Sequence, residues 1–137
     1  MQISVLGAGA WGTALAIAAA RHHAVTLWAR DPAQAQALSA DRANTRYLPD
    51  RPFPDTLVAT ADWSAAVDHA QGDGLFVVAT PMAALRDTLA RLPHDARVLW
   101  LCKGFEAGTG LLGHQIAREM SARARPILDD DLLVVDG

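Results

Sequence analysis

The stretch Gly7-Ala8-Gly9-Ala10-Trp11-Gly12 decides the fold of this chain. It follows residues 3–6, which are mostly apolar, and it precedes residues 13–20, which are rich in alanine, the strongest helix former. A strand, a glycine turn and a helix are therefore expected in that order. In this context the G-x-G-x-x-G pattern is typical of dinucleotide binding, with a purely structural glycine turn as the alternative.

Each residue of the turn has an expected role. Gly7 can adopt the backbone angles of a tight turn, and Gly9 has no Cβ, so a pyrophosphate can approach the backbone. Gly12 allows the helix to pack closely on the strand, and the first N–H groups of the helix, from Ala10 onward, point toward the phosphates. Trp11 is expected to pack along the pyrophosphate or against the helix. We therefore predict that these five residues bind the cofactor.

The totals indicate one globular domain, residues 1–137. Apolar residues make up 51% of the chain, and the formal net charge of −3 gives no electrostatic case for nucleic acid or a membrane surface. No apolar run reaches the length of a membrane span, and a strand is expected directly at the N-terminus, where a signal peptide would stand. The single cysteine, Cys102, has no internal disulfide partner. Together these features predict a cytoplasmic protein.

Sequence patterns give no metal site and no catalytic residue. The five histidines, at positions 22, 23, 69, 94 and 114, lack the spacing of metal ligands, and no nucleophile–base pair can be identified. The basic residues are eleven arginines and one lysine, Lys103. A lysine kept in such a chain is consistent with a need for a compact, rotatable ammonium group.

Strands and helices are expected to alternate along the chain. We predict strands at 2–6, 24–29, 56–60, 75–79 and 97–102, and helices at 10–21, 33–42, 62–70, 82–92 and after 110. Residues 44–54, with prolines at 49, 52 and 54, are predicted to be a loop, and residues 132–135 a sixth strand or a frayed tail. The alternation predicts an α/β fold, a Rossmann-type doubly wound parallel sheet in a three-layer α/β/α arrangement.

The end of the second strand should select the cofactor. An arginine there pairs with the 2′-phosphate of NADP, whereas a carboxylate binds the ribose hydroxyls of NAD. Arg30 occupies the tip, and the next residue, Asp31, also has a helix-capping role ahead of Pro32. The sequence therefore favours NADP over NAD, with a solvated surface charge as the alternative role of Arg30.

The ends of the fourth and fifth strands should flank the nicotinamide, because the carboxyl ends of parallel strands face one crevice. Thr80-Pro81 follows the fourth strand and Lys103-Gly104 follows the fifth. We predict that Pro81 and Lys103 contact the cofactor, with a surface position as the alternative for Lys103.

These segments resemble a family, the NAD(P)-dependent glycerol-3-phosphate dehydrogenases of the bacterial type. The resemblance extends over nearly the whole chain, to about residue 120, and the Asn-x-x-Tyr-Leu-Pro and Lys-Gly-Phe-Glu segments are more specific than the glycine turn. The matching segments are Gly7-Ala8-Gly9-Ala10-Trp11-Gly12-Thr13-Ala14-Leu15-Ala16, Leu27-Trp28-Ala29-Arg30, Asn44-Thr45-Arg46-Tyr47-Leu48-Pro49, Ala79-Thr80-Pro81 and Cys102-Lys103-Gly104-Phe105-Glu106.

The resemblance implies roles for individual residues. Trp11 and Arg30 would contact NADPH, and Lys103 would contact both the cofactor and the substrate. The family interconverts sn-glycerol 3-phosphate and dihydroxyacetone phosphate by hydride transfer, which supplies the backbone for phospholipid synthesis.

The sequence departs from the family pattern at two places. Thr80 stands where the family often has valine, and Asp136 stands where a Ser-Gly-Pro segment would begin. The resemblance places the general base, a lysine, and most substrate-phosphate contacts in a helical domain beyond this point. We therefore expect the chain to correspond to the cofactor half of the enzyme, inactive alone through truncation or a broken reading frame, with an apolar surface that favours homo-oligomers.

Two other functions stay open on the sequence. The chain could be a stand-alone NADP-binding or redox-sensing module. It could also belong to a dehydrogenase for another hydroxy acid, since ketopantoate reductase begins similarly.

Overall fold

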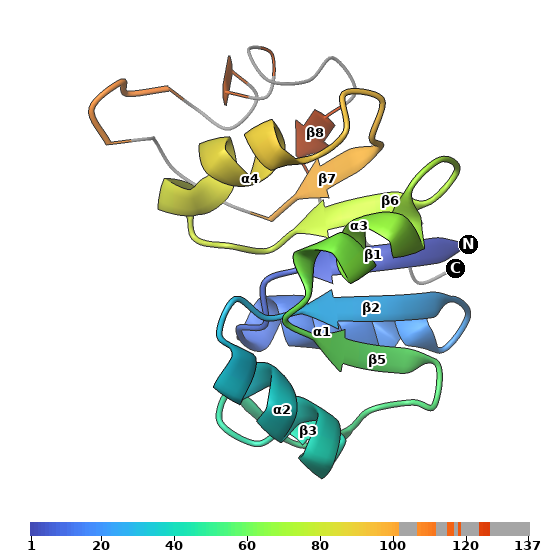
Figure 1. Cartoon of the computed structure of the whole chain (residues 1–137). Coiled ribbons are helices and arrows are strands. Elements are labelled where there is room, and N and C mark those ends of the chain that lie inside the picture. The colour runs from blue at the N-terminus through green and yellow to red at the C-terminus, as the bar shows by residue number, and fades with distance from the viewer. Residues whose placement is uncertain (102–106, 112–114, 117, 119–123, 127–137) are drawn as a thin grey trace.

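The computed structural model describes residues 1–101, 107–111, 115–116, 118 and 124–126, which form a sheet with helices on both faces (Figure 1). The strands of the large sheet are β1 (Gln2–Leu6), β2 (Ala24–Trp28), β5 (Leu57–Thr60), β6 (Leu75–Val78), β7 (Val98–Trp100) and β8 (Ala124–Pro126). The helices are α1 (Ala10–Ala20), α2 (Pro32–Asp41), α3 (Trp63–Ala70) and α4 (Leu85–Arg91), with a 3₁₀ turn, η1 (Met82–Ala84), before α4. A small antiparallel ribbon consists of β3 (Ala43–Asn44) and β4 (Leu48–Pro52).

The six strands of the large sheet are parallel and lie in the order β5-β2-β1-β6-β7-β8. From β1 the chain moves outward through β2 to β5, and it then returns to β6 on the other side of β1 and continues outward to β7. The direction of winding therefore reverses between β1 and β6, which is where doubly wound sheets bind ligands. This topology confirms the predicted Rossmann-type α/β fold.

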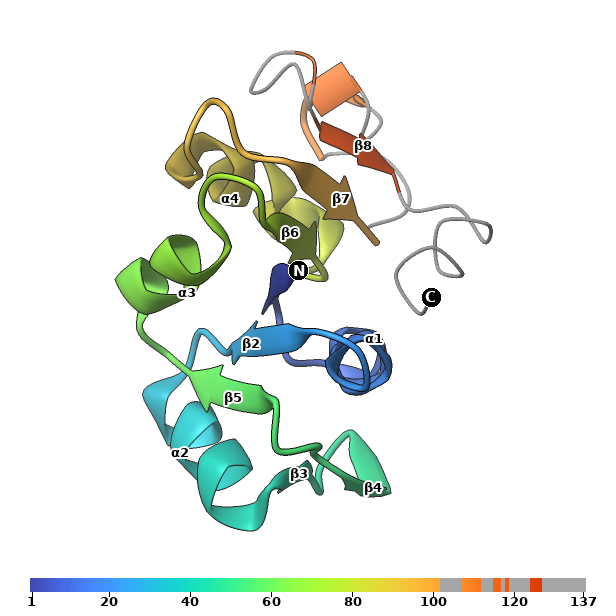
Figure 2. The same ribbon diagram turned by 90° about the vertical axis from the view of Figure 1, so that its right-hand side faces the viewer.

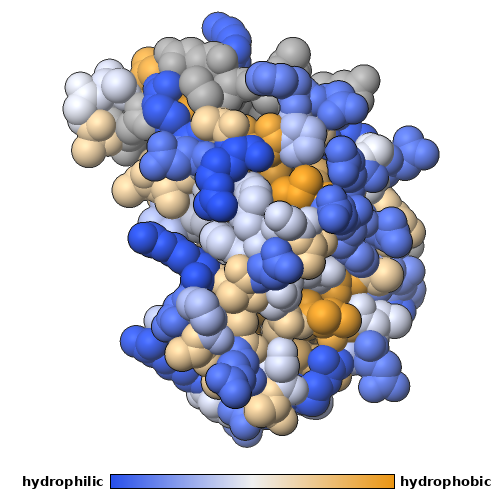
Figure 3. Space-filling model, viewed as in Figure 1, coloured by the Kyte–Doolittle hydropathy of each residue, from blue (hydrophilic) through white to orange (hydrophobic). Residues whose placement is uncertain are grey.

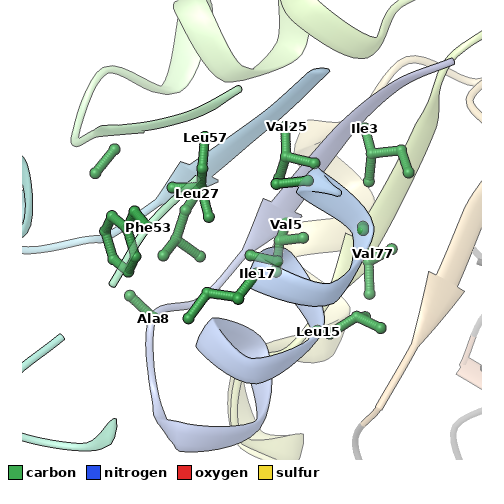
Figure 4. Close-up of a cluster of buried hydrophobic side chains, with 14 of the residues drawn as sticks. Ile3, Val5, Ala8, Leu15, Ile17, Val25, Leu27, Phe53, Leu57 and Val77 are labelled. Atoms are coloured by element: carbon green, nitrogen blue, oxygen red, sulfur yellow. The ribbon is translucent and has the colours of Figure 1, made fainter. Parts of the chain in front are cut away.

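The buried strand residues alternate between two cores, one on each face of the sheet. Figure 2 shows α1 and α3 on opposite sides of the strands. One core packs strand side chains against α1, α2 and Phe53, and Figure 4 shows part of it, including Ile3, Val5, Val25, Leu27 and Val77. The other core packs the intervening strand positions against α3 and α4, and it includes Leu6, Phe76, Val78, Val98 and Trp100. Because both faces are covered, the strands are apolar at nearly every position.

Two aspartates begin helices where the sequence predicts. The Asp31 carboxylate accepts a hydrogen bond from Ala33 N at 3.0 Å, directly before Pro32 at the first helical position. The Asp62 carboxylate accepts from Ala65 N at 3.3 Å. Both satisfy N–H groups that have no partner within the helix.

The loop predicted for residues 44–54 is wrong, because the chain forms the β3–β4 ribbon there. Two of the three prolines lie on β4. Among the described residues β4 pairs with β3 alone, and a strand with one neighbour tolerates prolines because it has no second strand that needs their missing N–H groups. Arg42 and Asp50 adopt positive φ values of 50° and 68°, which turn the chain at the ribbon. Phe53 then returns to the core and donates its N–H to the Arg42 carbonyl at 2.7 Å.

Two other predictions differ in detail. The helix predicted over residues 82–92 begins as the 3₁₀ turn η1, a common start for an α-helix, before it continues as α4. The strand β8 was not predicted. The strand predicted at 132–135 and most of the helix predicted after residue 110 lie outside the described residues.

Candidate functional site

Two glycines of the turn between β1 and α1 are required by packing. Gly7 has φ = 121°, and a Cβ built there would lie 2.7 Å from the Ala79 carbonyl oxygen. A Cβ built at Gly12 would meet the Gly7 carbonyl oxygen directly. Any side chain at either position would push α1 away from the end of the sheet, so the fold itself explains both residues.

Gly9 is not required by packing. Among the described residues, a Cβ built there would have no heavy atom within 4 Å beyond its chain neighbours. Its backbone angles, φ = −78° and ψ = −169°, lie in the extended region that any residue adopts. The open space in front of Gly9 is therefore available to a ligand, as the dinucleotide motif predicts.

The N-terminus of α1 faces the same space. The first hydrogen bond of the helix runs from Thr13 N to Gly9 O at 3.0 Å, so the N–H groups of residues 10–12 precede the helical ladder. No acidic side chain stands in the first turn. These N–H groups and the positive end of the helix dipole favour an anion such as a phosphate.

A cavity of about 1200 Å³ opens at this end of the sheet. The strand arrows in Figure 1 point toward it, and Figure 3 shows the surface indented on the same side. At one end it reaches α2 and the β3–β4 ribbon, and at the other it reaches η1 and α4. Its lining includes residues 7–12, Trp28, Arg30, Gln34, Tyr47, residues 79–82, Ala84, residues 87–88, residues 90–91 and Leu101.

The structure brings most of the predicted cofactor residues together. The lining of this cavity contains Gly7, Gly9, Ala10, Trp11, Gly12, Arg30 and Pro81. Trp11 is 76% exposed, so its side chain is not packed into the described part of the protein, and its position along the cofactor stays a prediction. Lys103 lies outside the described residues, so its predicted contacts stay a prediction.

Three residues near the cavity were missed by sequence reasoning as site residues. Gln34 donates from Nε2 to the Ala8 carbonyl at 3.1 Å. Tyr47 lines the cavity, is 43% exposed and carries the Arg46 guanidinium 4.9 Å from its ring centre. Asn44 is buried behind the glycine turn. Asn44 and Tyr47 belong to the Asn-x-x-Tyr-Leu-Pro motif, which was used only as a mark of family resemblance and could have identified them.

The described part of the chain contains no group of three or more metal-binding side chains. None of its helices has the length and apolar character needed to cross a bilayer. The cavity lining combines the N-terminus of α1 with the arginines Arg30 and Arg91, aromatic side chains and the carboxylate of Asp87. Backbone N–H groups at a helix N-terminus and arginine side chains suit a phosphate-containing nucleotide.

Comparison with known proteins gives a consistent result. A family profile described as the N-terminus of NAD-dependent glycerol-3-phosphate dehydrogenase matches residues 2–129. Proteins named glycerol-3-phosphate dehydrogenase [NAD(P)+] from Leptothrix cholodnii and Methylibium petroleiphilum are 59% and 58% identical over 131 and 127 residues. These alignments cover 88% and 91% of this chain but 39% and 38% of the relatives.

A solved structure supports the same relationship. The crystal structure of glycerol-3-phosphate dehydrogenase from Coxiella burnetii superimposes with a TM-score of 0.79 at 31% identity. The match covers 90% of this chain and 38% of that protein. The chain thus spans less than two fifths of the length of the relatives that it matches.

Proposed function

The chain belongs to the NAD-dependent glycerol-3-phosphate dehydrogenase family, whose N-terminal domain it matches, and we propose from this that it binds NADP(H) or NAD(H). The pyrophosphate would lie on the N–H groups at the start of α1. One observation carries the proposal. Gly9 faces open space and has ordinary backbone angles, so a ligand explains this glycine better than the fold does.

We propose that the cofactor lies along the cavity from Arg30 to Pro81. Arg30 follows β2 at its carboxyl end, is exposed and lines the cavity, which suits a contact with the adenosine 2′-phosphate. Trp11 would lie along the pyrophosphate, and Pro81 would border the nicotinamide. Lys103 would contact both the nicotinamide end and the substrate, as the family resemblance implies.

Arg30→Ala is expected to remove the preference for NADP⁺ over NAD⁺. A charge-assisted hydrogen bond contributes about 1.5–3 kcal/mol, which corresponds to a loss of about 10- to 100-fold in affinity for NADP⁺. NAD⁺ affinity should change little, because NAD⁺ lacks the 2′-phosphate. Calorimetric titration with both cofactors measures the two dissociation constants.

The matched control is Arg21→Ala. Arg21 is an exposed arginine at the C-terminal cap of α1, at the opposite end of that helix from the glycine turn, and its loss changes the net charge equally. Equal affinities for the two cofactors in the unmodified chain, or an unchanged preference in Arg30→Ala, would contradict the assignment.

We propose further that the complete enzyme to which this domain belongs interconverts sn-glycerol 3-phosphate and dihydroxyacetone phosphate by hydride transfer. Relatives named glycerol-3-phosphate dehydrogenase [NAD(P)+] support this reaction. Its product would supply glycerophospholipid synthesis, and the single cysteine fits the reducing cytoplasm.

Self-association of the 137-residue chain is also proposed. Val58 is 57% exposed on β5, which lies at an edge of the large sheet, and Trp11 is exposed as well. Apolar side chains exposed at the surface favour association with other chains. Analytical ultracentrifugation should show oligomers that grow with concentration, and a clean monomer at high concentration would overturn this point.

A further inference from the structure

The side chain of Asn44 connects the β3–β4 ribbon to the glycine turn. It is only 2% exposed, although asparagine is usually found at the surface. Its amide nitrogen donates to the Ala8 carbonyl at 2.9 Å and to Thr13 Oγ1 at 2.8 Å, and its amide oxygen accepts from Tyr47 N at 3.3 Å. Both amide hydrogens and the amide oxygen therefore have partners.

These partners fix the orientation of the amide. If the amide were flipped, its oxygen would face the Ala8 carbonyl oxygen, and two acceptors would be in contact without a hydrogen between them. The Ala8 carbonyl also accepts from Gln34, so two side-chain amides from β3 and α2 hold one carbonyl group.

The held carbonyl belongs to the peptide that joins Ala8 to Gly9. In a planar trans peptide the C=O and N–H groups point in opposite directions. Fixing the Ala8 carbonyl toward Asn44 therefore directs the Gly9 N–H away from Asn44. Gly9 lines the cavity, whereas Asn44 is buried behind the turn.

We propose that Asn44 is a positioning residue for the cofactor. Its amide nitrogen holds the Ala8–Gly9 peptide so that the Gly9 N–H is directed at the pyrophosphate, and its amide oxygen holds the backbone N–H of Tyr47, which lines the same cavity. The inference rests on the proposed binding of a dinucleotide. It assigns a function to the Asn-x-x-Tyr-Leu-Pro motif, which otherwise serves only as a family mark.

The test compares NADP⁺ affinity and stability in four variants. Asn44→Ala removes all three hydrogen bonds, and Asn44→Asp keeps the size of the side chain but replaces both donated hydrogens by an acceptor. Thr13→Val removes the second acceptor and leaves the Ala8 contact in place. Ser4→Ala is the matched control, since Ser4 is fully buried and its hydroxyl donates to the Ala66 carbonyl at 2.6 Å in the core on the other face of the sheet.

Urea unfolding gives the folded fraction of each variant, and titration with NADP⁺ gives the dissociation constant of that fraction. We expect at least a tenfold higher dissociation constant for Asn44→Ala and Asn44→Asp, and values within about threefold of the unmodified chain for Thr13→Val. Ser4→Ala should lose stability and keep its affinity within twofold.

Three results would overturn the inference. Either Asn44 variant could bind NADP⁺ within twofold of the unmodified chain, or Ser4→Ala could lose as much affinity as Asn44→Ala, which would indicate a general effect of lost stability. The unmodified chain could also fail to bind NADP⁺, and this third result would overturn the proposed function together with the inference, whereas the first two leave the proposed function intact.

Discussion

Replacing Gly9 with valine is expected to abolish NADP⁺ binding while the chain stays folded. Apart from the chain neighbours of Gly9, no atom of the described residues lies within 4 Å of the added Cβ, so the fold accommodates the valine side chain. The pyrophosphate would have to occupy the same space and would be displaced from the N–H groups of α1. We expect a loss of at least a hundredfold in affinity, which corresponds to about 2.8 kcal/mol.

Protein fluorescence during titration with NADPH measures binding, and far-ultraviolet circular dichroism measures the fold. Ala40→Val is the matched control, because it also introduces a valine, but at an exposed position of α2 that is not part of the cavity lining. Gly12→Val serves as a second comparison, in which we expect the fold to be lost. Its Cβ would meet the Gly7 carbonyl, so this variant should lose the fold together with binding. If Gly9→Val is folded and binds NADPH with unchanged affinity, the phosphates lie elsewhere.

The second large effect concerns turnover by the 137-residue chain assayed alone. We expect it to bind NADPH and to show no measurable reduction of dihydroxyacetone phosphate. Hydride transfer requires a held nicotinamide, a held substrate phosphate and a group that exchanges the hydroxyl proton. Arg30, Trp11 and Pro81 are assigned to the cofactor, and the only lysine of the sequence, Lys103, is assigned to cofactor and substrate contact rather than to proton transfer.

The expected loss of turnover is large because it combines two contributions to the rate, orientation of the reactants and general-base catalysis. Orientation of the reactants lowers barriers by roughly 7–11 kcal/mol, and a general base contributes roughly 10²–10⁴-fold in rate. The assay follows the absorbance of the reduced nicotinamide in both directions, with a full-length relative as the positive control. Turnover by this chain at the rate of that relative would show that a base lies within these 137 residues.

Much of the fold could be predicted because local signals agree with the tertiary structure. The glycine turn, the apolar strands and the capping aspartates Asp31 and Asp62 each determine structure within a few residues. The β3–β4 ribbon could not be predicted in this way. β3 has only two residues, and β4 contains prolines that indicate a loop when considered alone. Its stability depends on contacts with distant segments, such as the Asn44 side chain on the glycine turn.

The candidate site also combines features that the local sequence predicts with features that depend on contacts between distant residues. Arg30 and the glycines follow from their positions at strand ends, where parallel sheets bind ligands. The side chain of Asn44 donates hydrogen bonds to Ala8 and Thr13, which precede it by 36 and 31 positions in the chain. No periodicity in the sequence indicates such distant pairs. The different roles of Gly7, Gly9 and Gly12 were predicted from the sequence, and the surrounding atoms add that packing constrains Gly7 and Gly12 but not Gly9.

The central claim is that the start of α1 binds the cofactor pyrophosphate, and an NMR titration of ¹⁵N-labelled chain with NADP⁺ tests it most directly. We expect saturable shifts of the amide signals of Gly9, Ala10, Trp11 and Gly12, with inorganic phosphate alone causing smaller shifts of the same signals. Signals at the opposite end of the sheet, such as that of Ala24, should stay unchanged. If NADP⁺ leaves the four amide signals in place while it shifts others, or if it shifts none, the pyrophosphate does not bind at the start of α1.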